Sequence, residues 1–243
     1  MDLVIDIGNT RTKAAVFAQK AIVEVIRCDT AELVDEVRGL LERFKLIDRA
    51  MISAVGDEPD GLVAALDGLA EVLWVDEHTE LMFENAYQSK ETLGADRKAL
   101  MAAAHRNYPQ KSVLVIDMGT CITYDLLEGG ARYLGGAISP GWRMRVEAMH
   151  EFTSKLPSLQ PSEPMTVLGD TTASCMQIGA YNGVLGELQE LIKAYRKRFE
   201  DLTVILTGGD AEIFGKRLKN CIFAHSNFLL EGLHELLEYN SVR

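Results

Sequence analysis

Two short segments of the chain place a carboxylate, a glycine and several hydroxyl groups at the end of an apolar run. The segment LVIDIG at residues 3–8 returns 111 positions later as LVIDMG at residues 114–119. The first copy continues with NTRTK at residues 9–13, and the second continues with TCIT at residues 120–123. Backbone amides, hydroxyls and a lysine ammonium at such turns bind phosphate oxygens and hydrated metal ions. Two of these turns facing each other across a cleft would hold a nucleoside triphosphate from both sides.

Each copy is typical of a buried strand that leads into a tight turn. An apolar run that stops at Asp-x-Gly uses glycine where the backbone turns sharply or approaches a ligand. The alternative is an ordinary hairpin turn, because Gly8-Asn9 is a common hairpin sequence and Lys13 would then be solvated. The second copy at Asp117 argues against this alternative, since a plain turn has no need of another carboxylate at its strand end.

The composition excludes several classes of function. The 25 basic and 36 acidic residues give a net charge of −11, which repels nucleic acid and anionic membranes, so we expect neither as a partner. The four cysteines at positions 28, 121, 175 and 221 are far apart and predict neither a zinc knuckle nor a disulfide framework. No signal peptide and no apolar run of about 18 residues is present, so a cytoplasmic protein is expected.

The elements that position the two turns are expected in a similar order twice. In residues 1–110, we expect three strands at 2–7, 12–18 and 21–28, followed by a helix at 30–44. Two strands come next, at 51–55 and 72–75, with a helix after Pro59 between them. An ordered loop at 76–95 then leads to a helix at 96–107. In residues 111–243, strands at 113–118, 121–127 and 131–138 precede a helix after Pro140-Gly141, a long helix at about 172–199, a strand at 204–206, a helix at 210–219, a strand at 221–223 and a helix at 227–239. We therefore predict two domains, residues 1–110 and 111–243.

This repeated order resembles the superfamily of acetate and sugar kinases, heat-shock chaperone ATPases and actin. The resemblance implies an α/β fold of two duplicated ribonuclease H-like (actin-like ATPase) domains, each with a mixed five-stranded sheet, and a nucleotide cleft between them. Within that superfamily, the chain most resembles the type III pantothenate kinases. The motifs that carry this resemblance are D6-I-G-N-T-x-x-K13, Tyr87 followed by G94-A-D-R97, D117-M-G-T-x-x-T-x-D125, G135-G-A-I-S-P-G141, Leu156-Pro157, G169-x-T-T172, T207-G-G209 and E231-G-L233.

The resemblance assigns the nucleotide and its cations to the two turns. It implies ATP binding by Asp6, Ile7, Gly8, Asn9, Thr10, Arg11, Thr12, Lys13 and Thr120. Asp6 would orient hydrated Mg²⁺, which prefers carboxylates and retains water ligands. Asp117 would hold a monovalent cation, K⁺ or NH₄⁺. The alternative for Asp117 is a carboxylate that accepts hydrogen bonds from the backbone of its own turn.

The segment Gly94-Ala95-Asp96-Arg97 opens a helix, and Asp96 alone is a plausible N-cap. Phosphoryl transfer to an alcohol also needs a carboxylate within reach of the attacking hydroxyl. The resemblance makes Asp96 the catalytic base. The planar fork of Arg97 suits the carboxylate of pantothenate, and Gly94 would let the backbone approach the ligand.

Tyr87 and Thr172 complete the implied pantothenate site. Tyr87 could instead be a half-buried aromatic residue, and Thr172 is a plausible N-cap of the long helix. In the family the site lies at a dimer interface, so the resemblance implies a homodimer in which Thr172 reaches the site of the neighbouring subunit. Residues 207–210 would meet adenine or ribose, although they could be a plain strand-to-helix turn capped by Asp210.

The expected function is ATP-dependent phosphorylation of pantothenate to 4′-phosphopantothenate, the first step of coenzyme A biosynthesis. The alternative is a non-catalytic nucleotide-binding transcriptional accessory protein of the same fold. Intact Asp6, Asp96 and Asp117 argue against that alternative, because a regulator needs neither a base nor a cation site. The chain departs from the family pattern at Thr171, where asparagine is common, and at Cys121, where a small residue is usual.

Overall fold

The computed structural model describes residues 1–8, 11–56, 58–218, 221–223 and 226–241. The chain divides into two compact units. The first unit comprises Met1–Gln110, Gly129–Leu134 and Asn227–Arg243, and the second unit comprises Lys111–Glu128 and Gly135–Ser226. Among the described residues, no helix combines the length and apolar character needed to cross a membrane.

The first unit is built on a five-stranded mixed sheet of order β3-β2-β1-β4-β5. Its strands are β1 (Asp2–Ile7), β2 (Thr12–Ala18), β3 (Ala21–Cys28), β4 (Arg49–Ala54) and β5 (Glu71–Trp74). β1 is antiparallel to β2 and parallel to β4, and every residue of β1 is buried. A central strand buried on both faces explains why its sequence reads as a nearly continuous apolar run.

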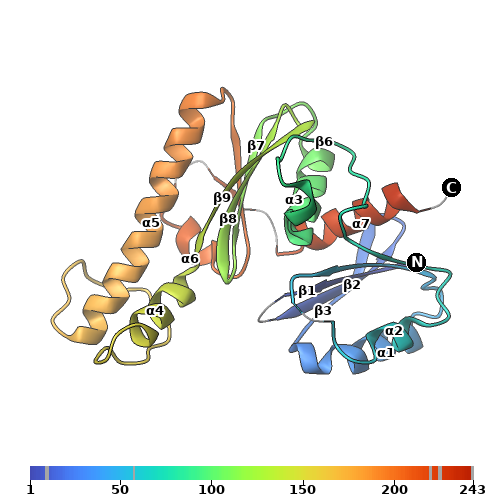
Figure 1. Ribbon diagram of the computed structural model, residues 1–243, viewed down its shortest axis with the longest axis horizontal. Coiled ribbons are helices and arrows are strands. Elements are labelled where there is room, and N and C mark those ends of the chain that lie inside the picture. The colour runs from blue at the N-terminus through green and yellow to red at the C-terminus, as the bar shows by residue number, and fades with distance from the viewer. Residues whose placement is uncertain (9–10, 57, 219–220, 224–225, 242–243) are drawn as a thin grey trace. The chain divides into compact units, whose positions relative to one another are not determined.

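Helices cover both faces of this sheet (Figure 1). Leu3, Ile5 and Ile7 share a core with α1 (Leu33–Arg43) and α2 (Leu62–Leu66). Because side chains alternate along a strand, Asp2 and Asp6 lie on the opposite face. That face carries α7 (Phe228–Asn240), which packs against β1, β2 and β4 and against α3 (Ala95–Asn107).

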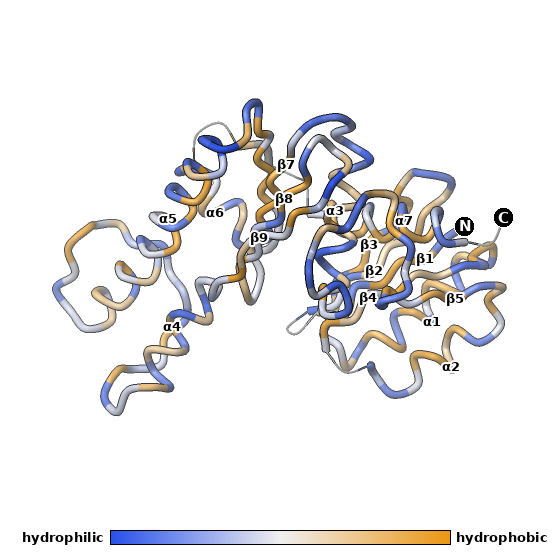
Figure 2. The backbone as a smooth tube through the Cα atoms, turned by 45° about the horizontal axis from the view of Figure 1, so that its top comes forward, coloured by the Kyte–Doolittle hydropathy of each residue, from blue (hydrophilic) through white to orange (hydrophobic). Residues whose placement is uncertain are grey.

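The second unit contains most of a six-stranded sheet of order β11-β10-β7-β8-β9-β6. The strands are β6 (Glu84–Asn85), β7 (Val113–Met118), β8 (Cys121–Glu128), β9 (Arg132–Pro140), β10 (Thr203–Thr207) and β11 (Ile222–Phe223). Figure 2 shows β7 and β8 as predominantly hydrophobic. The helices are α4 (Trp142–Glu151), α5 (Thr172–Arg198) and α6 (Ala211–Gly215), and they meet in an aromatic cluster of Trp142, Tyr181 and Phe214.

The two sheets repeat the same strand order and the same register. Strands β3-β2-β1-β4-β5 correspond to β9-β8-β7-β10-β11, and β6 adds a sixth strand beside β9. Asp6 is paired with Lys13 in β2 and Ser53 in β4, while Asp117 is paired with Thr123 in β8 and Thr207 in β10. The predicted duplication of an Asp-x-Gly strand end is therefore confirmed as a repeat of three-dimensional structure.

Several local expectations differ from the structure. The helix expected at 30–44 consists of a 3₁₀ turn, Thr30–Glu32, followed by α1. The loop expected at 76–95 contains the two-residue β6 and a 3₁₀ turn, Lys90–Thr92, and both are too short to show a periodic pattern. The helix expected at 210–219 is the five-residue α6.

Candidate functional site

Asp6 lies one residue before the end of β1 and is a buried carboxylate with a hydroxyl donor beside it. Its exposed fraction is 9%, and the Ser53 hydroxyl donates a hydrogen bond to Oδ1 over 3.2 Å. Burial and the negative charge of Asp96 raise the pKa of Asp6 to about 6, against the opposing influence of Lys13 and Ser53. Within the first unit, Asp6 is thus close enough to Asp96 and Lys13 for their charges to shift its pKa.

Asp96 lies in the first turn of α3, where Gly94 occupies the N-cap position. The prediction that Asp96 could be the N-cap is therefore wrong, because Asp96 is the second helical residue and its Oδ1 accepts the backbone N–H of Arg97 over 2.8 Å. A Cβ on Gly94 would lie 2.5 Å from Asp96 Oδ1. A side chain at position 94 would displace the Asp96 carboxylate, which folds back against the backbone there, and the buried Ala95 opens the helix between them.

Arg97 packs against two tyrosine rings that also contact each other. Its guanidinium carbon lies 5.3 Å from the ring centroid of Tyr87 and 6.0 Å from that of Tyr133, and the two ring centroids are 5.9 Å apart. Arg97 is only 5% exposed and Tyr133 is fully buried. The structure thus brings the predicted pair Tyr87 and Arg97 together. Sequence reasoning missed Tyr133, which carries no motif and lies 36 positions after Arg97.

The remaining predicted residues of the first turn surround the end of β1. Ile7 is buried in β1, and a Cβ on Gly8 would lie 2.7 Å from the carbonyl oxygen of Arg11. Thr12 is buried with its hydroxyl 3.3 Å from that of Thr30, whereas Arg11 is exposed. Asn9 and Thr10 lie outside the described residues.

In the second unit, Asp117 lies one residue before the end of β7, against a glycine with a left-handed backbone. Gly208 has φ +94°, and a Cβ there would lie 2.4 Å from Asp117 Oδ1 and 2.5 Å from the backbone nitrogen of Met118. Gly208 follows Thr207, the β10 partner of Asp117 in register. The Thr207-Gly208-Gly209 motif therefore has a structural reason, since any side chain at position 208 would displace the Asp117 carboxylate or the strand end.

The turn after Asp117 is closed by the Pro140-Gly141 motif. The backbone N–H of Gly141 donates to the carbonyl oxygen of Thr120 over 3.0 Å, and a Cβ on Gly141 would lie 2.4 Å from the carbonyl oxygen of Gly119. Thr120 and Cys121 are both exposed, so their side chains are accessible at this turn. Two glycines distant in sequence, Gly141 and Gly208, thus shape the surroundings of Asp117 and Thr120.

A half-buried hydrogen-bond network, absent from the sequence expectations, supports this turn. Glu187 of α5 accepts a hydrogen bond from the Tyr124 hydroxyl over 2.8 Å and one from the Ser139 hydroxyl, and it pairs with Arg145 over 2.6 Å. Arg145 also donates to the carbonyl oxygen of Pro140 over 2.9 Å. Burial alone would raise the pKa of Glu187, but these hydrogen bonds hold that pKa below its ordinary value. The network connects β8, β9, α4 and α5 next to Gly141.

Thr172 is the first residue of α5 rather than its cap. Thr171 is the N-cap, and it exchanges hydrogen bonds with Ser174 in a capping box. The prediction of Thr172 as N-cap is therefore wrong by one position, because either of two adjacent threonines could supply the hydroxyl and the Ser174 partner selects the first. Thr172 is exposed and belongs to the second unit.

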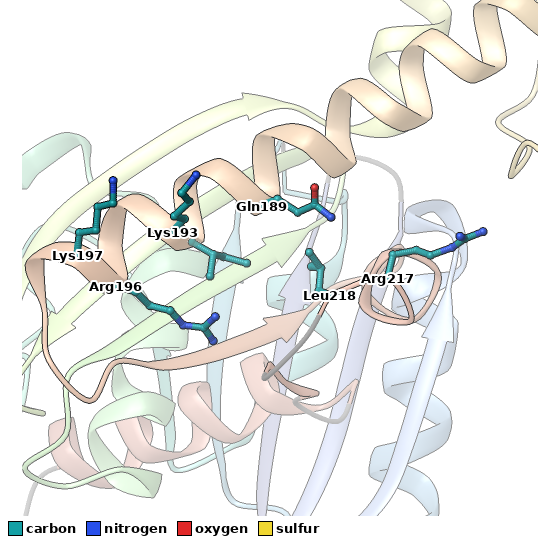
Figure 3. A pocket seen from close by; sticks show the side chains of 7 residues that line it. Gln189, Lys193, Arg196, Lys197, Arg217 and Leu218 are labelled. Atoms are coloured by element: carbon teal, nitrogen blue, oxygen red, sulfur yellow. The ribbon is translucent and has the colours of Figure 1, made fainter. Parts of the chain in front are cut away.

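One surface pocket of the second unit is lined by none of the predicted site residues. Its volume is about 490 Å³, and Figure 3 shows its lining side chains on α5 and after α6: Gln189, Ile192, Lys193, Arg196, Lys197, Arg217 and Leu218. The basic side chains of this pocket do not point toward a common centre, since Lys193 and Lys197 point away from Arg196 in Figure 3. Lys193 pairs with Glu190 at 3.2 Å and Arg217 with Glu163 at 3.4 Å. We therefore do not place the active site in this pocket.

Among the described residues, one group of side chains has the chemistry of a metal site: Asp2, His234 and Glu238. Arg49 lies among them, 2.9 Å from Asp2 Oδ1 and 2.6 Å from Glu238 Oε1, and His234 Nε2 is 3.0 Å from Asp2 Oδ2. Burial raises the pKa of Asp2, but hydrogen bonds with Arg49 and His234 outweigh it and hold the pKa below its ordinary value. The Arg49 guanidinium already pairs with both carboxylates of this cluster, which fastens α7 to β1 and β4.

Comparison with known proteins identifies similar sequences along the whole chain. A family model described as type III pantothenate kinase matches residues 2–194. The chain is 45% identical to the type III pantothenate kinase of Christiangramia forsetii, with all of both chains covered, and 41% identical to that of Flavobacterium johnsoniae, with 98% of both covered.

Solved structures extend the comparison to the fold. A glucokinase from an Antarctic psychrotroph has a TM-score of 0.54 at 13% identity, covering 98% of this chain and 99% of its own. A Campylobacter jejuni protein described as a Baf family transcriptional activator has a TM-score of 0.62 at 19% identity, with 98% of both chains covered. At such low identity these likenesses bear on the fold alone, and the sugar kinase likeness confirms the predicted actin-like ATPase fold.

Proposed function

The chain belongs to the type III pantothenate kinase family, and we propose that the neighbouring residues Asp6, Tyr87, Asp96 and Arg97 perform its reaction. Enzymes of this family phosphorylate pantothenate in coenzyme A biosynthesis, with ATP and a divalent metal ion. The product is 4′-phosphopantothenate, formed at the primary hydroxyl. The observation that carries the assignment is the position of Asp96. It lies near Asp6 in space and directly precedes Arg97, which is buried against the ring of Tyr87.

Asp96 is the proposed catalytic base. A base must lie within hydrogen-bond reach of the hydroxyl that it deprotonates. Its carboxylate is fixed by the backbone N–H of Arg97 and by its close approach to Gly94, so it has one preferred orientation. Arg97, next in sequence, is proposed to bind the pantothenate carboxylate, which would orient the hydroxyl at the other end of the substrate toward Asp96. Tyr87, Gly94 and Ala95 complete this side of the site.

Asp6 is the proposed ligand that orients hydrated Mg²⁺. A buried carboxylate beside a hydroxyl, with a pKa raised to about 6, fits a divalent cation, because the cation would offset the cost of ionising Asp6 in this environment. When bound, Mg²⁺ neutralises phosphate charge as it develops. Lys13 adds positive charge at the same strand end, and the ATP phosphates are assigned to residues 6–13 and to Thr120, with Asn9 and Thr10 assigned from the sequence alone.

We propose that Asp117 holds a monovalent cation, K⁺ or NH₄⁺. The carboxylate lies against Gly208, and the register neighbours of Asp117 are the hydroxyl residues Thr123 and Thr207, whose oxygens are uncharged. Such oxygens suit a weakly charged cation better than a second Mg²⁺. The test is a K⁺ titration of activity against a Na⁺ background. Asp117→Asn should abolish the K⁺ response and leave the Mg²⁺ requirement unchanged, whereas a K⁺ response that persists in this variant would exclude Asp117.

The active form is proposed to be a homodimer in which Thr172 contributes to the site of the partner subunit. The connection between α4 and α5 exposes Phe152, Met165, Val167 and Leu168, each with more than 80% of its surface accessible. Exposed apolar side chains gathered in one segment mark an interaction surface. Mixing Asp96→Asn chains with Thr172→Val chains should restore activity if each site draws on two subunits, and failure of the mixture to regain activity would argue for self-contained subunits.

We also propose the domain boundaries and the cellular location of the protein. We infer that the duplicated domains are residues 1–110 and 111–243, and that the closing helix α7 packs onto the first sheet although it lies at the end of the second copy. We also place the enzyme in the cytoplasm, because Cys28, Cys121, Cys175 and Cys221 are all free thiols.

The decisive experiment is ADP release measured with purified protein, MgATP and pantothenate, with and without K⁺. We expect ADP formation only with pantothenate, and stimulation by K⁺. A blank without pantothenate reports background ATP hydrolysis. Nucleotide binding without any pantothenate-dependent turnover would overturn the enzyme assignment and favour a non-catalytic regulator.

A further inference from the structure

A short segment of the β8–β9 hairpin is packed into the first unit at the proposed substrate site. Residues 129–134 belong to the first unit, although the strands on either side of them belong to the second copy of the fold. The carbonyl oxygen of Ala131 accepts the backbone N–H of Glu84 over 2.8 Å, and that of Tyr133 accepts the N–H of Ala86 over 3.0 Å. Tyr133 is therefore fixed by backbone hydrogen bonds to the segment that leads directly into Tyr87.

A second anchor holds the hairpin tip from the C-terminal end of α3. His105 Nδ1 lies 2.6 Å from the carbonyl oxygen of Gly130. Gly130 has φ +69°, and a Cβ there would lie 2.5 Å from the backbone nitrogen of Gln110. The tip fits closely against this part of the first unit, so the position of the Tyr133 ring is determined by the backbone rather than by side-chain packing alone.

The Tyr133 ring is fully buried and lies beside the Arg97 guanidinium. Arg97 is 5% exposed and packs against the adjoining rings of Tyr133 and Tyr87, with centroids 6.0 Å and 5.3 Å from its guanidinium carbon. A guanidinium at this distance from two π faces is attracted to both, and the attraction is stronger where water is excluded. Phe83 packs edge-on against Tyr133, with centroids 6.4 Å apart, and closes the aromatic cluster.

We propose that Tyr133 is a positioning residue that, with Tyr87, orients the Arg97 guanidinium for the carboxylate of the substrate. This inference rests on the proposed role of Arg97 in binding that carboxylate. An arginine that is already desolvated and packed against two rings loses little conformational freedom when it forms a bidentate pair, so the pair discriminates strongly in favour of an anionic acceptor. Tyr133 thereby contributes to specificity without being required to contact the substrate.

The test compares pantothenate with pantothenol, an uncharged analogue in which a hydroxymethyl group replaces the carboxylate. Tyr133→Leu should raise KM for pantothenate about tenfold, as expected for the loss of one desolvated cation–π contact. It should leave KM for ATP and the kinetics with pantothenol unchanged. Tyr133→Phe keeps the ring and should behave like the unsubstituted enzyme. Phe83→Leu removes a neighbouring ring from the same cluster, and we expect it to leave the preference for pantothenate intact.

The outcomes separate this inference from the function on which it rests. Arg97→Leu tests the premise, since it should abolish the preference for pantothenate over pantothenol. If Arg97→Leu does so and Tyr133→Leu does not, the role of Tyr133 is refuted while the function stands. Equal losses in Tyr133→Phe and Tyr133→Leu would also refute it, because the hydroxyl would then be the important group. Should Tyr133→Leu fail to fold, Tyr133→Met provides the same comparison, because its unbranched, flexible side chain adapts to the vacated space. A protein that phosphorylates neither compound would refute the proposed function itself.

Discussion

The two copies of the strand-and-turn motif place a carboxylate at the same register position and surround it with different groups. In the first unit, Asp6 faces Lys13 and Ser53 across β1, and Asp96 adds a second negative charge nearby. In the second unit, Asp117 faces Thr123 and Thr207, and Gly208 lies directly against its oxygen. The backbone scaffold is thus repeated, while the side chains that determine the chemistry are not.

This difference indicates how one duplicated element can serve two tasks. Around Asp6, a second carboxylate and an ammonium make the local charge depend on protonation and on bound cations, which suits phosphoryl transfer. Around Asp117, the register partners Thr123 and Thr207 are uncharged hydroxyl residues. The duplication supplies the position of each carboxylate, and the residues on the two flanking strands supply its function.

The largest expected effect tests the additional carboxylate of the first unit. Asp96→Asn should lower kcat by about 10²- to 10⁴-fold, the usual contribution of a general base, with little change in KM for ATP. Folding should be retained, because the asparagine carbonyl can still accept the backbone N–H of Arg97. Turnover would be measured as ADP release, with thermal unfolding as the control. Near-full activity in a folded variant would refute Asp96 as the base.

Much of this comparison could be predicted from the sequence, because it depends on local patterns. Apolar runs ending in Asp-x-Gly predicted β1 and β7, and the segment from Gly94 to Arg97 predicted the opening of α3. The cap of α5 was misplaced by one residue because Thr171 and Thr172 are chemically equivalent in sequence, and only the hydrogen bond to Ser174 distinguishes them.

The contacts that join distant segments could not be predicted. Ser53 donates to Asp6 from 47 positions away, and its identity as a partner depends on the parallel register of β1 with β4. Tyr133 reaches Arg97 only because a hairpin tip of the second copy packs into the first unit. Glu187 likewise carries no local signal, since its partners Tyr124, Ser139 and Arg145 come from three other elements. Such pairings follow from tertiary packing, which the periodicity of a single segment does not encode.

The second prediction concerns the ionisation of Asp6 in the ligand-free protein. The pKa of Asp6 in the folded state is about 6, above its ordinary value of 3.8, so folding favours the protonated form. This contribution to stability is complete below about pH 4 and is lost as the pH rises through 6, at a cost of up to about 3 kcal/mol. Asp6→Asn cannot ionise and should lack this loss.

Urea denaturation between pH 4.5 and 7.5 in the presence of EDTA would measure that difference. The free energy of unfolding of the unsubstituted protein should fall relative to that of Asp6→Asn as the pH rises. Taking the difference between the two proteins removes the contribution of other titrating groups, such as Asp2, whose pKa is shifted downward. Parallel pH profiles for the two proteins would contradict the raised pKa of Asp6.

The third prediction tests the surroundings of Asp117. Gly208→Ala should destabilise the protein by about 2 kcal/mol, because alanine is strained at φ +94° and its Cβ would approach Asp117 Oδ1. It should also weaken the response of the activity to K⁺. Gly209→Ala is the matched control, since a Cβ there meets no atom of the described residues within 4 Å. Equal effects of the two substitutions on unfolding would show that the contact with Asp117 is unimportant.

The smallest expected effect distinguishes the two carboxylates by their β-strand partners. Ser53→Ala removes a buried hydrogen bond to Asp6 and should cost about 1 kcal/mol at neutral pH. This cost should shrink near pH 4.5, where Asp6 is protonated and the hydrogen bond no longer stabilises a charge. Loss of the Ser53 hydrogen bond should also raise the pKa of Asp6 above 6. Thr207→Val alters the corresponding position beside Asp117 and should leave the titration of Asp6 unchanged. A pH-independent cost for Ser53→Ala would mean that the hydroxyl contributes packing rather than stabilisation of the ionised carboxylate, and the electrostatic contrast between the two copies would then rest on Asp96 and Lys13 alone.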